Sequence, residues 1–174
     1  MWTYSGGSAA LIACALHKAT GKPIDELARD ALFEPLGISH VEWARYPSTG
    51  EPVAASGLRL LPRDTLKFGQ LVLDKGAWHG KQIVPSPWIE AAIAPQINGP
   101  GSTFYGYQFG LERSLVGGRE IDWAAGVGYG GQRLIIVPSL DLVVLVHAGL
   151  YASRMQQGIA DIVLNRFVLP AVAR

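Results

Sequence analysis

Hydrophobic residues recur at helical spacing through the first part of the chain. Residues 8–19 are apolar at nearly every position and lie between glycines, a pattern that predicts a helix buried on most of its sides. Pro23 marks the start of a second predicted helix, and the acidic Asp25 and Glu26 suit the positive end of its dipole. Residues 39–56 show no regular spacing and predict a surface connection. In all, helices are predicted over residues 8–19, 24–33, 62–75 and 86–93.

The spacing of hydrophobic residues changes after a segment rich in proline and glycine at residues 94–103. Residues 105–111 alternate between large apolar side chains and small or polar ones, as a strand with one buried face does. Residues 133–137 and 142–147 are runs of Val, Ile and Leu separated by a short turn, so we predict that they pair as antiparallel strands. Residues 153–168 are predicted to form an amphipathic helix that closes the chain.

These elements predict an α+β fold with two parts. A helical lobe is expected over residues 1–97, and an antiparallel sheet covered by a C-terminal helix is expected over residues 98–174. The composition agrees with a chain that has a substantial core, because 49% of its 174 residues are hydrophobic and only 17% are charged. Such a chain must bury much of its surface, within itself or against a second surface.

The charge and hydropathy of the chain exclude two classes of partner. The formal net charge is +1 and Lys and Arg do not cluster, so we expect no nucleic acid and no anionic membrane as partners. The longest apolar run, around residues 142–146, is far shorter than the roughly 20 residues that a membrane span needs. Residues 1–7 lack the pattern of a signal peptide, and any such segment would lie upstream, so the compartment stays open between cytoplasm and periplasm.

Cysteine and histidine usage predicts neither a disulfide nor a metal site. Cys14 is the single cysteine, so an internal disulfide is excluded and a small buried thiol is expected. The histidines lack the spacing of metal ligands, and we interpret them as surface residues or as core residues with satisfied hydrogen bonds. They are His17, His40, His79 and His147. We therefore expect no metal and no cofactor.

Short stretches distributed along the chain carry a resemblance to a known family. The chain resembles the C-terminal half of serine hydrolases of the class C β-lactamase and penicillin-binding protein family. The stretch at residues 130–142 is most similar to esterase-type members and 6-aminohexanoate-dimer hydrolases. The stretches are Tyr4-Ser5-Gly6, residues 20–23, residues 33–38, residues 55–64 and residues 130–142.

The resemblance implies a catalytic apparatus of three elements. They are a Ser-x-x-Lys nucleophile, a Tyr-x-Asn element whose tyrosine relays a proton, and a Lys-Thr-Gly triplet on a sheet-edge strand that offers backbone N–H groups to the oxyanion. Tyr4 matches the tyrosine of the second element, whereas Gly6 stands where the family has asparagine. Gly6 therefore replaces a side-chain amide expected at the substrate. The alternative for Tyr4 is an ordinary boundary tyrosine that packs beside Trp2.

Counting back from Val137-Pro138 places Trp123-Ala124-Ala125 at the position of the Lys-Thr-Gly triplet. The resemblance implies that these residues contact substrate. Because Trp123 replaces the lysine, binding of a penicillin carboxylate is disfavoured and an esterase or amidase is favoured. Gly126 would follow as the backbone donor to the oxyanion. A plain hairpin or bulge explains the glycines of residues 126–131 equally well, whereas a phosphate loop would need a Gly-Lys-Ser/Thr sequence that they lack.

The nucleophile element is missing, because no serine of the chain has lysine three residues on. If the resemblance holds, the nucleophile helix would lie upstream of Met1. Two hypotheses follow. The first is the C-terminal part of a hydrolase that acts on small amides or esters through an acyl-serine, inactive alone, whose partner is the missing N-terminal half or a second copy of the chain. The second is a non-catalytic binding or assembly module with the same fold.

Overall fold

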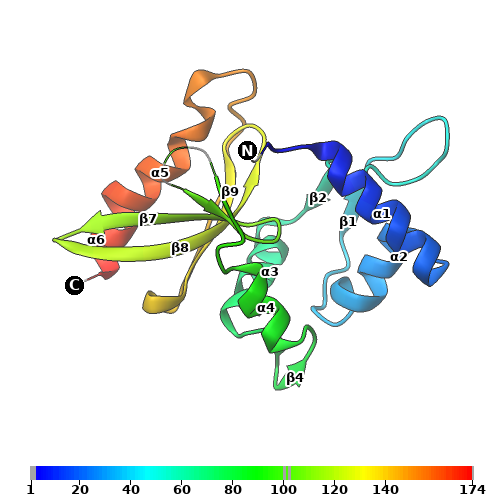
Figure 1. Ribbon diagram of the computed structural model, residues 1–174, viewed down its shortest axis with the longest axis horizontal. Helices are drawn as coiled ribbons and strands as arrows, with labels where there is room; N and C mark the ends of the chain where they lie inside the picture. The colour runs from blue at the N-terminus through cyan, green and yellow to red at the C-terminus, as the bar shows by residue number, and fades with distance from the viewer. Residues whose placement is uncertain (1–2, 100, 102, 174) are drawn as a thin grey trace. The chain divides into compact units, whose positions relative to one another are not determined.

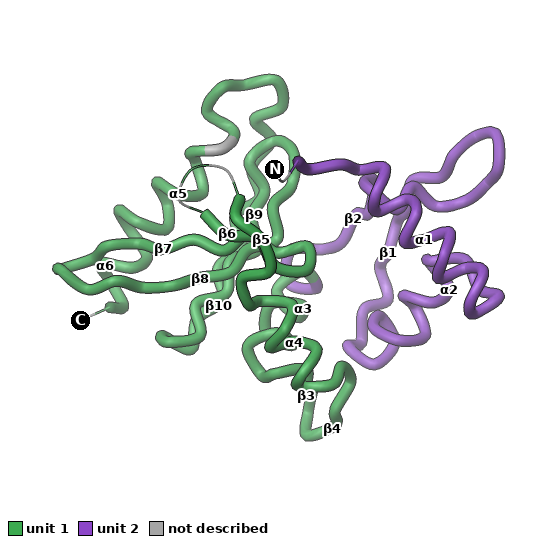
Figure 2. Tube along the Cα trace, in the orientation of Figure 1, with its two compact units in different colours: residues 1–2, 65–174 green, residues 3–64 purple. Residues whose placement is uncertain are grey.

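The protein, described by a computed structural model over residues 3–99, 101 and 103–173, forms two compact units. Unit 2 comprises Thr3–Asp64, and unit 1 comprises the chain from Thr65 onward (Figure 2). The division by packing thus lies at Asp64, whereas the predicted boundary between the lobes lies between residues 97 and 98. The two helices between these points have helical spacing but pack on the sheet of unit 1, so the pattern alone could not assign them to it.

Unit 2 contains two helical segments and one short hairpin. Its helices are α1 (Gly6–Thr20) and α2 (Ile24–Ala28), and α2 continues as the π-helical η1 (Arg29–Phe33). Its strands β1 (Val41–Trp43) and β2 (Leu58–Leu60) pair antiparallel. The two predicted helices are therefore confirmed. The prediction that residues 39–56 are irregular was wrong at β1, because a strand of three residues is too short to produce a recognisable alternation.

Helix α1 is exposed, which differs from the prediction that its apolar residues are buried. None of its residues is buried, and the Leu11 side chain is 73% exposed. Cys14, predicted to be a small buried thiol, is exposed as well. The helix ends at Gly21, whose left-handed conformation (φ 71°) lets its N–H donate to the carbonyl oxygen of His17. Helix α1 thus has more apolar residues than the described residues of unit 2 cover.

Unit 1 is built around a six-stranded sheet with the order β10-β9-β8-β7-β6-β5, in which all neighbouring strands are antiparallel. The strands are β5 (Ile97–Asn98), β6 (Phe104–Tyr105), β7 (Gly110–Val116), β8 (Arg119–Gly128), β9 (Gln132–Val137) and β10 (Leu142–Val146). The α+β fold with an antiparallel sheet is therefore confirmed, as is the pairing of β9 with β10 across the 3₁₀ turn η2 (Pro138–Leu140).

The stretch from Tyr105 to Leu111 is not the single strand that its alternation predicted. Strand β6 ends at Tyr105, and the chain reverses so that Tyr105 pairs with Gly110 of β7. Gly106 and Gln108 make this turn possible. A Cβ on Gly106 would lie 2.1 Å from the carbonyl oxygen of Ala92, and Gln108 has a left-handed backbone (φ 66°). Two short strands joined by a tight turn therefore produced the apparent alternation.

Helices cover both faces of the sheet in unit 1 (Figure 1). The C-terminal segments lie on one face: η3 (Arg154–Gln157), α5 (Ile159–Val163), the π-helical η4 (Leu164–Val168) and α6 (Leu169–Val172). The other face is covered by α3 (Pro62–Leu73) and α4 (Ser86–Ala92). Between α3 and α4 the chain forms a hairpin of β3 (Ala77–Trp78) and β4 (Lys81–Gln82). On the first face Leu164 and Leu169 pack against Ile135, and all three are fully buried. On the second face Val72 and Ile89 pack against Ile136.

Candidate functional site

Strand β8 carries the residues predicted to face the substrate. It was expected to lie at the edge of the sheet, but it is an inner strand over most of its length, because it pairs with both β7 and β9. Its pairing with β7 ends at Ala125, opposite Gly110, whereas its pairing with β9 continues to Gly128. Residues 126–128 therefore extend beyond β7 and have a partner strand on one side only. Alternate N–H groups of an antiparallel strand point to opposite sides, so this short stretch presents an N–H to the side that β7 leaves open.

Trp123 lies in the core between the sheet and the C-terminal helices. Its side chain is 4% exposed and packs in the same cluster as Leu164 and Leu169. Its indole Nε1 donates a hydrogen bond to the hydroxyl of Ser114 at 2.9 Å. The structure thus gives this side chain a packing role, and no contact in it supports the predicted role of Trp123 at the substrate.

Ala124 and Ala125 are both buried, on opposite faces of the sheet. Ala125 belongs to the cluster under the C-terminal helices, whereas Ala124 is the register partner of Ile136, which packs under α3 and α4. Gly126 comes next and is only half-buried. The transition from core to accessible strand thus falls between Ala125 and Gly126, at the residue to which the sequence assigned the oxyanion donor.

A hollow of about 310 Å³ opens over residues 126–128. Its walls come from the start of α3, the turn between β6 and β7, strands β8 and β9, and the end of β10. The side chains that shape it include Thr65, Gln108, Gln132, Leu134, Leu145 and His147. Sequence reasoning missed Gln108, Gln132 and His147 as members of one site, because they lie on or beside different strands and only the sheet register brings them together.

Arg133 contributes to the wall of the hollow, but its guanidinium is engaged on the opposite face of the sheet. Its Nη1 lies 2.8 Å from a carboxylate oxygen of Asp161 and 3.4 Å from one of Glu112, and its side chain is 8% exposed. Burial raises the pKa of the Glu112 carboxyl above its ordinary value, and Arg133 opposes this shift. Burial likewise raises the pKa of Asp161, again against the effect of Arg133. The cation is thus held by two carboxylates and is not offered to the hollow.

Tyr4 and Gly6 belong to unit 2, so they lie in a different compact unit from Gly126. Tyr4 precedes α1 and is 62% exposed. Gly6 is the first residue of α1, and a Cβ there would lie 3.3 Å from the Cβ of Ala55, so the asparagine of the family would be a tight fit at this position. Trp2, the alternative packing partner of Tyr4, lies outside the described residues.

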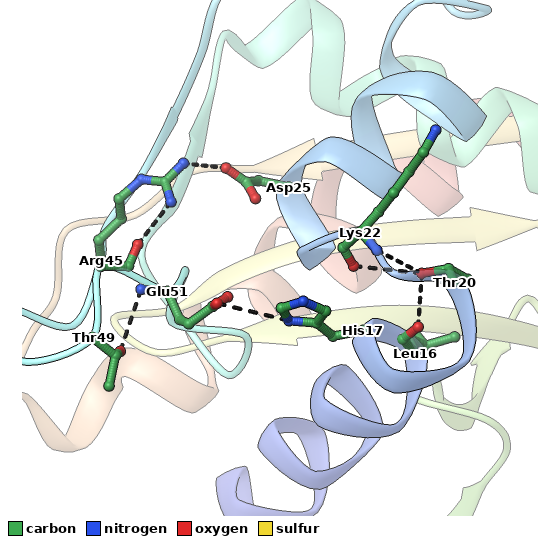
Figure 3. Close-up of polar contacts among 9 residues, drawn as sticks. Leu16, His17, Thr20, Lys22, Asp25, Arg45, Thr49 and Glu51 are labelled. Carbon is green, nitrogen blue, oxygen red and sulfur yellow. Dashed lines mark hydrogen bonds and ion pairs between the residues drawn. The ribbon is translucent and has the colours of Figure 1, made fainter.

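Unit 2 has a larger hollow of about 770 Å³, which contains none of the predicted site residues. Charged residues of its wall form ion pairs, as Asp25 does with Arg45 (Figure 3). The guanidinium of Arg45 also donates to the carbonyl oxygen of Gly50 at 2.8 Å. On α1, His17 Nδ1 lies 3.7 Å from a carboxylate oxygen of Glu51 (Figure 3). This hollow has ion pairs along its wall and none of the predicted site residues, whereas the hollow of unit 1 contains Gly126, so we place the candidate oxyanion site in unit 1.

Within residues 3–99, 101 and 103–173, no three His, Cys, Asp or Glu side chains are grouped so that they could hold a metal ion. Over the same residues, no helix has both the length and the apolar character needed to cross a membrane.

The sequence and the fold were compared with those of known proteins. Residues 1–159 match the family model for beta-lactamase. No curated protein matches the chain. A Bacillus anthracis protein assigned as a 6-aminohexanoate-dimer hydrolase superposes with a TM-score of 0.76 at 25% identity, over 90% of this chain and 40% of its own.

More distant solved structures share the fold. An octameric penicillin-binding protein homologue from Pyrococcus abyssi superposes with a TM-score of 0.68 at 17% identity, over 94% of this chain and 42% of its own. A beta-lactamase from Mycobacterium bovis superposes with a TM-score of 0.68 at 19% identity, over 93% of this chain and 63% of its own. The chain therefore spans between 40% and 63% of the length of these structures.

Proposed function

The chain belongs to the β-lactamase family, and from this premise we propose that it is the C-terminal part of a serine hydrolase that acts on small amides or esters through an acyl-serine intermediate. One observation carries the proposal: residues 126–128 of β8 lie beyond the end of its pairing with β7, at the point where the hollow opens. A backbone N–H that points into such a hollow can stabilise the negative charge that develops on a carbonyl oxygen.

The conformation of this strand suits a fixed oxyanion donor. Residues 124–128 pair in register with residues 132–136 of β9, so the backbone is held on one side while its other side opens at Gly126. An added Cβ on Gly126 would meet nothing within 4 Å, which agrees with an open approach to this residue. Donors that are already oriented need no reorganisation when the transition state forms, and this is the main source of their catalytic effect.

Tyr4 supplies the proton relay in this proposal. A phenol that lies close to a serine can pass a proton between the nucleophile and the leaving group. The serine itself must come from outside these residues, because the chain contains no Ser-x-x-Lys sequence. We therefore expect the isolated chain to be inactive, since loss of the nucleophile typically lowers kcat about a million-fold.

The charges around β8 support an uncharged substrate. The position that aligns with the lysine of the triplet holds Trp123, and the nearby guanidinium of Arg133 pairs with Glu112 and Asp161. Neither residue is placed to bind the carboxylate of a penicillin. This favours simple esters or amides, in agreement with the likeness to the Bacillus anthracis protein.

The test is complementation of the chain with a polypeptide that carries the Ser-x-x-Lys helix of the same reading frame. A nitrophenyl ester should be hydrolysed by the complemented protein and not by the chain alone. Tyr4→Phe should lower kcat by about 10²- to 10⁴-fold, whereas the control Tyr46→Phe, in the same unit, should not. A stoichiometric acyl adduct on the isolated chain, detected by mass spectrometry, would show that the nucleophile has been misplaced.

A second function, that of a non-catalytic assembly module, has one observation in its favour: the exposed apolar residues of α1, such as Leu11 and Ile12, suit a contact with another polypeptide. The DNA immediately upstream discriminates between the two functions. An in-frame Ser-x-x-Lys there supports the hydrolase, and a stop codon together with a promoter there supports the module.

A further inference from the structure

Two exposed tyrosines lie beside the hollow of unit 1. Tyr129 is in the turn between β8 and β9, and Tyr151 is in the segment that follows β10. Their ring centroids are 5.6 Å apart, and the side chains are 63% and 59% exposed. We call these two rings the aromatic ledge. Exposed aromatic rings that lie together are a common feature of surfaces that bind apolar groups.

Gln132 joins the aromatic ledge to the hollow. It lines the hollow, and its Nε2 donates to the carbonyl oxygen of Tyr129 at 3.3 Å and to the hydroxyl of Tyr151 at 3.4 Å. In the register of the sheet Gln132 faces Gly128, the last residue of the stretch that extends beyond β7. A molecule whose carbonyl occupies the hollow at residues 126–128 can therefore extend towards the rings.

The aromatic ledge is held by backbone contacts on both sides. The ring of Tyr151 lies against Gly130, where an added Cβ would come within 2.6 Å of the ring and where the backbone is left-handed (φ 89°). The hydroxyl of Tyr129 accepts a hydrogen bond from the N–H of Ala152 at 3.1 Å. The N–H of Gly130 donates to the side-chain oxygen of Gln156 at 3.0 Å. Rings that are fixed before binding lose less conformational entropy when a ligand packs on them.

The charges around the hollow indicate what kind of ligand fits. None of the described residues that line it is acidic, and its one guanidinium, on Arg133, pairs with Glu112 and Asp161. Gln108 and Gln132 provide neutral amide groups that can both donate and accept hydrogen bonds. Such a wall complements an uncharged carbonyl compound, and the adjacent rings complement a flat apolar substituent.

We propose that the aromatic ledge is a specificity site for the aromatic group of an uncharged ester or amide whose carbonyl lies at residues 126–128. This inference rests on the proposed function, since it names the substrate class of the same site. Tyr129 and Tyr151 act by contact with the substituent and take no part in proton transfer.

The experiment measures binding to the isolated chain, which needs no turnover. Acetanilide is titrated and followed by NMR, with N-propylacetamide as the uncharged ligand without a ring and benzoate as the charged aromatic one. Acetanilide should bind more tightly than both, with contacts from its ring protons to Tyr129 and Tyr151. Tyr151→Leu should weaken acetanilide binding about three- to tenfold, the range expected for one aromatic contact. The same change should alter N-propylacetamide binding by less than about twofold.

Two further variants keep the inference testable if Tyr151→Leu disturbs the fold. Tyr151→Phe retains the ring and loses only the contact with Gln132, so it should bind acetanilide almost as the parent does. Tyr46→Leu, in unit 2, is the matched control and should change nothing. Equal binding of acetanilide and N-propylacetamide, or ring contacts that fall away from both tyrosines, would overturn the inference.

The outcome separates the inference from the proposed function. If acetanilide binds at the aromatic ledge but the complemented protein hydrolyses no ester, the proposed hydrolase function is refuted and the binding site is retained. If the complemented enzyme hydrolyses phenyl and propyl esters equally well, the hydrolase function is retained and the aromatic ledge is refuted as a specificity site.

Discussion

Replacement of Arg133 by Met tests whether the ion cluster on the face covered by the C-terminal helices supports strand β8. The substitution removes the guanidinium and keeps a long apolar side chain beside Trp123, whose ring lies 5.9 Å from the guanidinium carbon. The carboxylates of Glu112 and Asp161 then face each other without a cation. Loss of one partner from a fully buried pair destabilises a protein by about 3–5 kcal/mol. The two carboxyl side chains are 29% and 36% exposed, so solvent screens them and we expect about 2 kcal/mol at pH 7.

The destabilisation should depend on pH in a defined direction. Burial already raises the pKa of Glu112 and Asp161, and the loss of Arg133 removes the effect that opposes this rise. A carboxyl whose pKa is raised in the folded state stabilises the fold below its unfolded pKa, and this contribution is lost as the pH rises through the folded pKa. Arg133→Met should therefore approach the stability of the parent in acid and fall furthest below it at pH 7 and above.

The assay is urea unfolding, followed by tryptophan fluorescence at several pH values. The triple variant Arg133→Met, Glu112→Gln, Asp161→Asn should recover most of the loss, because it leaves no uncompensated charge. A loss of stability that is the same at every pH, or a triple variant as unstable as the single one, would refute the electrostatic explanation and leave only packing.

Three further predictions concern packing and association. Leu164→Ala, at a fully buried position, should lower the free energy of unfolding by about 3 kcal/mol, whereas Leu115→Ala, at an exposed one, should change it by less than about 0.5 kcal/mol; urea unfolding measures both. Gly69→Ala should be destabilising by about 1–3 kcal/mol, because the added Cβ would lie 2.4 Å from a methyl group of Val143 in β10. A melting temperature equal to that of the parent would contradict this contact. The chain should self-associate at micromolar concentration through exposed apolar residues, and Leu11→Lys with Ile12→Lys should reduce the association seen by sedimentation; a parent chain that is a stable monomer would contradict the prediction.

Local sequence features were sufficient for most of the helices and for one pair of neighbouring strands, β9 and β10. Residues 62–73 and 86–92 form the helices that their proline starts and apolar spacing predicted. The runs of Val, Ile and Leu at β9 and β10 pair across a short turn, as expected from their separation. The resemblance to the family was also carried by short local stretches, and the family match over residues 1–159 confirms it. These features depend on neighbours in the chain, which a sequence displays directly.

The candidate site could be predicted only in part. Gly126 was identified from its position directly after the triplet, and it lies at the hollow. Trp123 was assigned to the substrate from the same alignment, but its side chain is in the core, because strand residues alternate between faces and the sequence does not say which face packs against the C-terminal helices. Gln108 and His147 join the hollow through strand register, which follows from hydrogen bonds between distant segments. The proton relay of Tyr4 and the binding of an ester or amide remain predictions.

By itself, then, the sequence determined which segments are helices, that β9 and β10 pair across a turn, and to which family the chain belongs, since each of these follows from periodicity, turn residues or local motifs. It did not determine that β8 is an inner strand up to Ala125 with one side open from residue 126 onward, nor that Tyr129 and Tyr151 meet beside Gln132. Strand order and register decided these features, because they bring together residues that are far apart in the chain and whose pairing is set by the packing of the whole sheet.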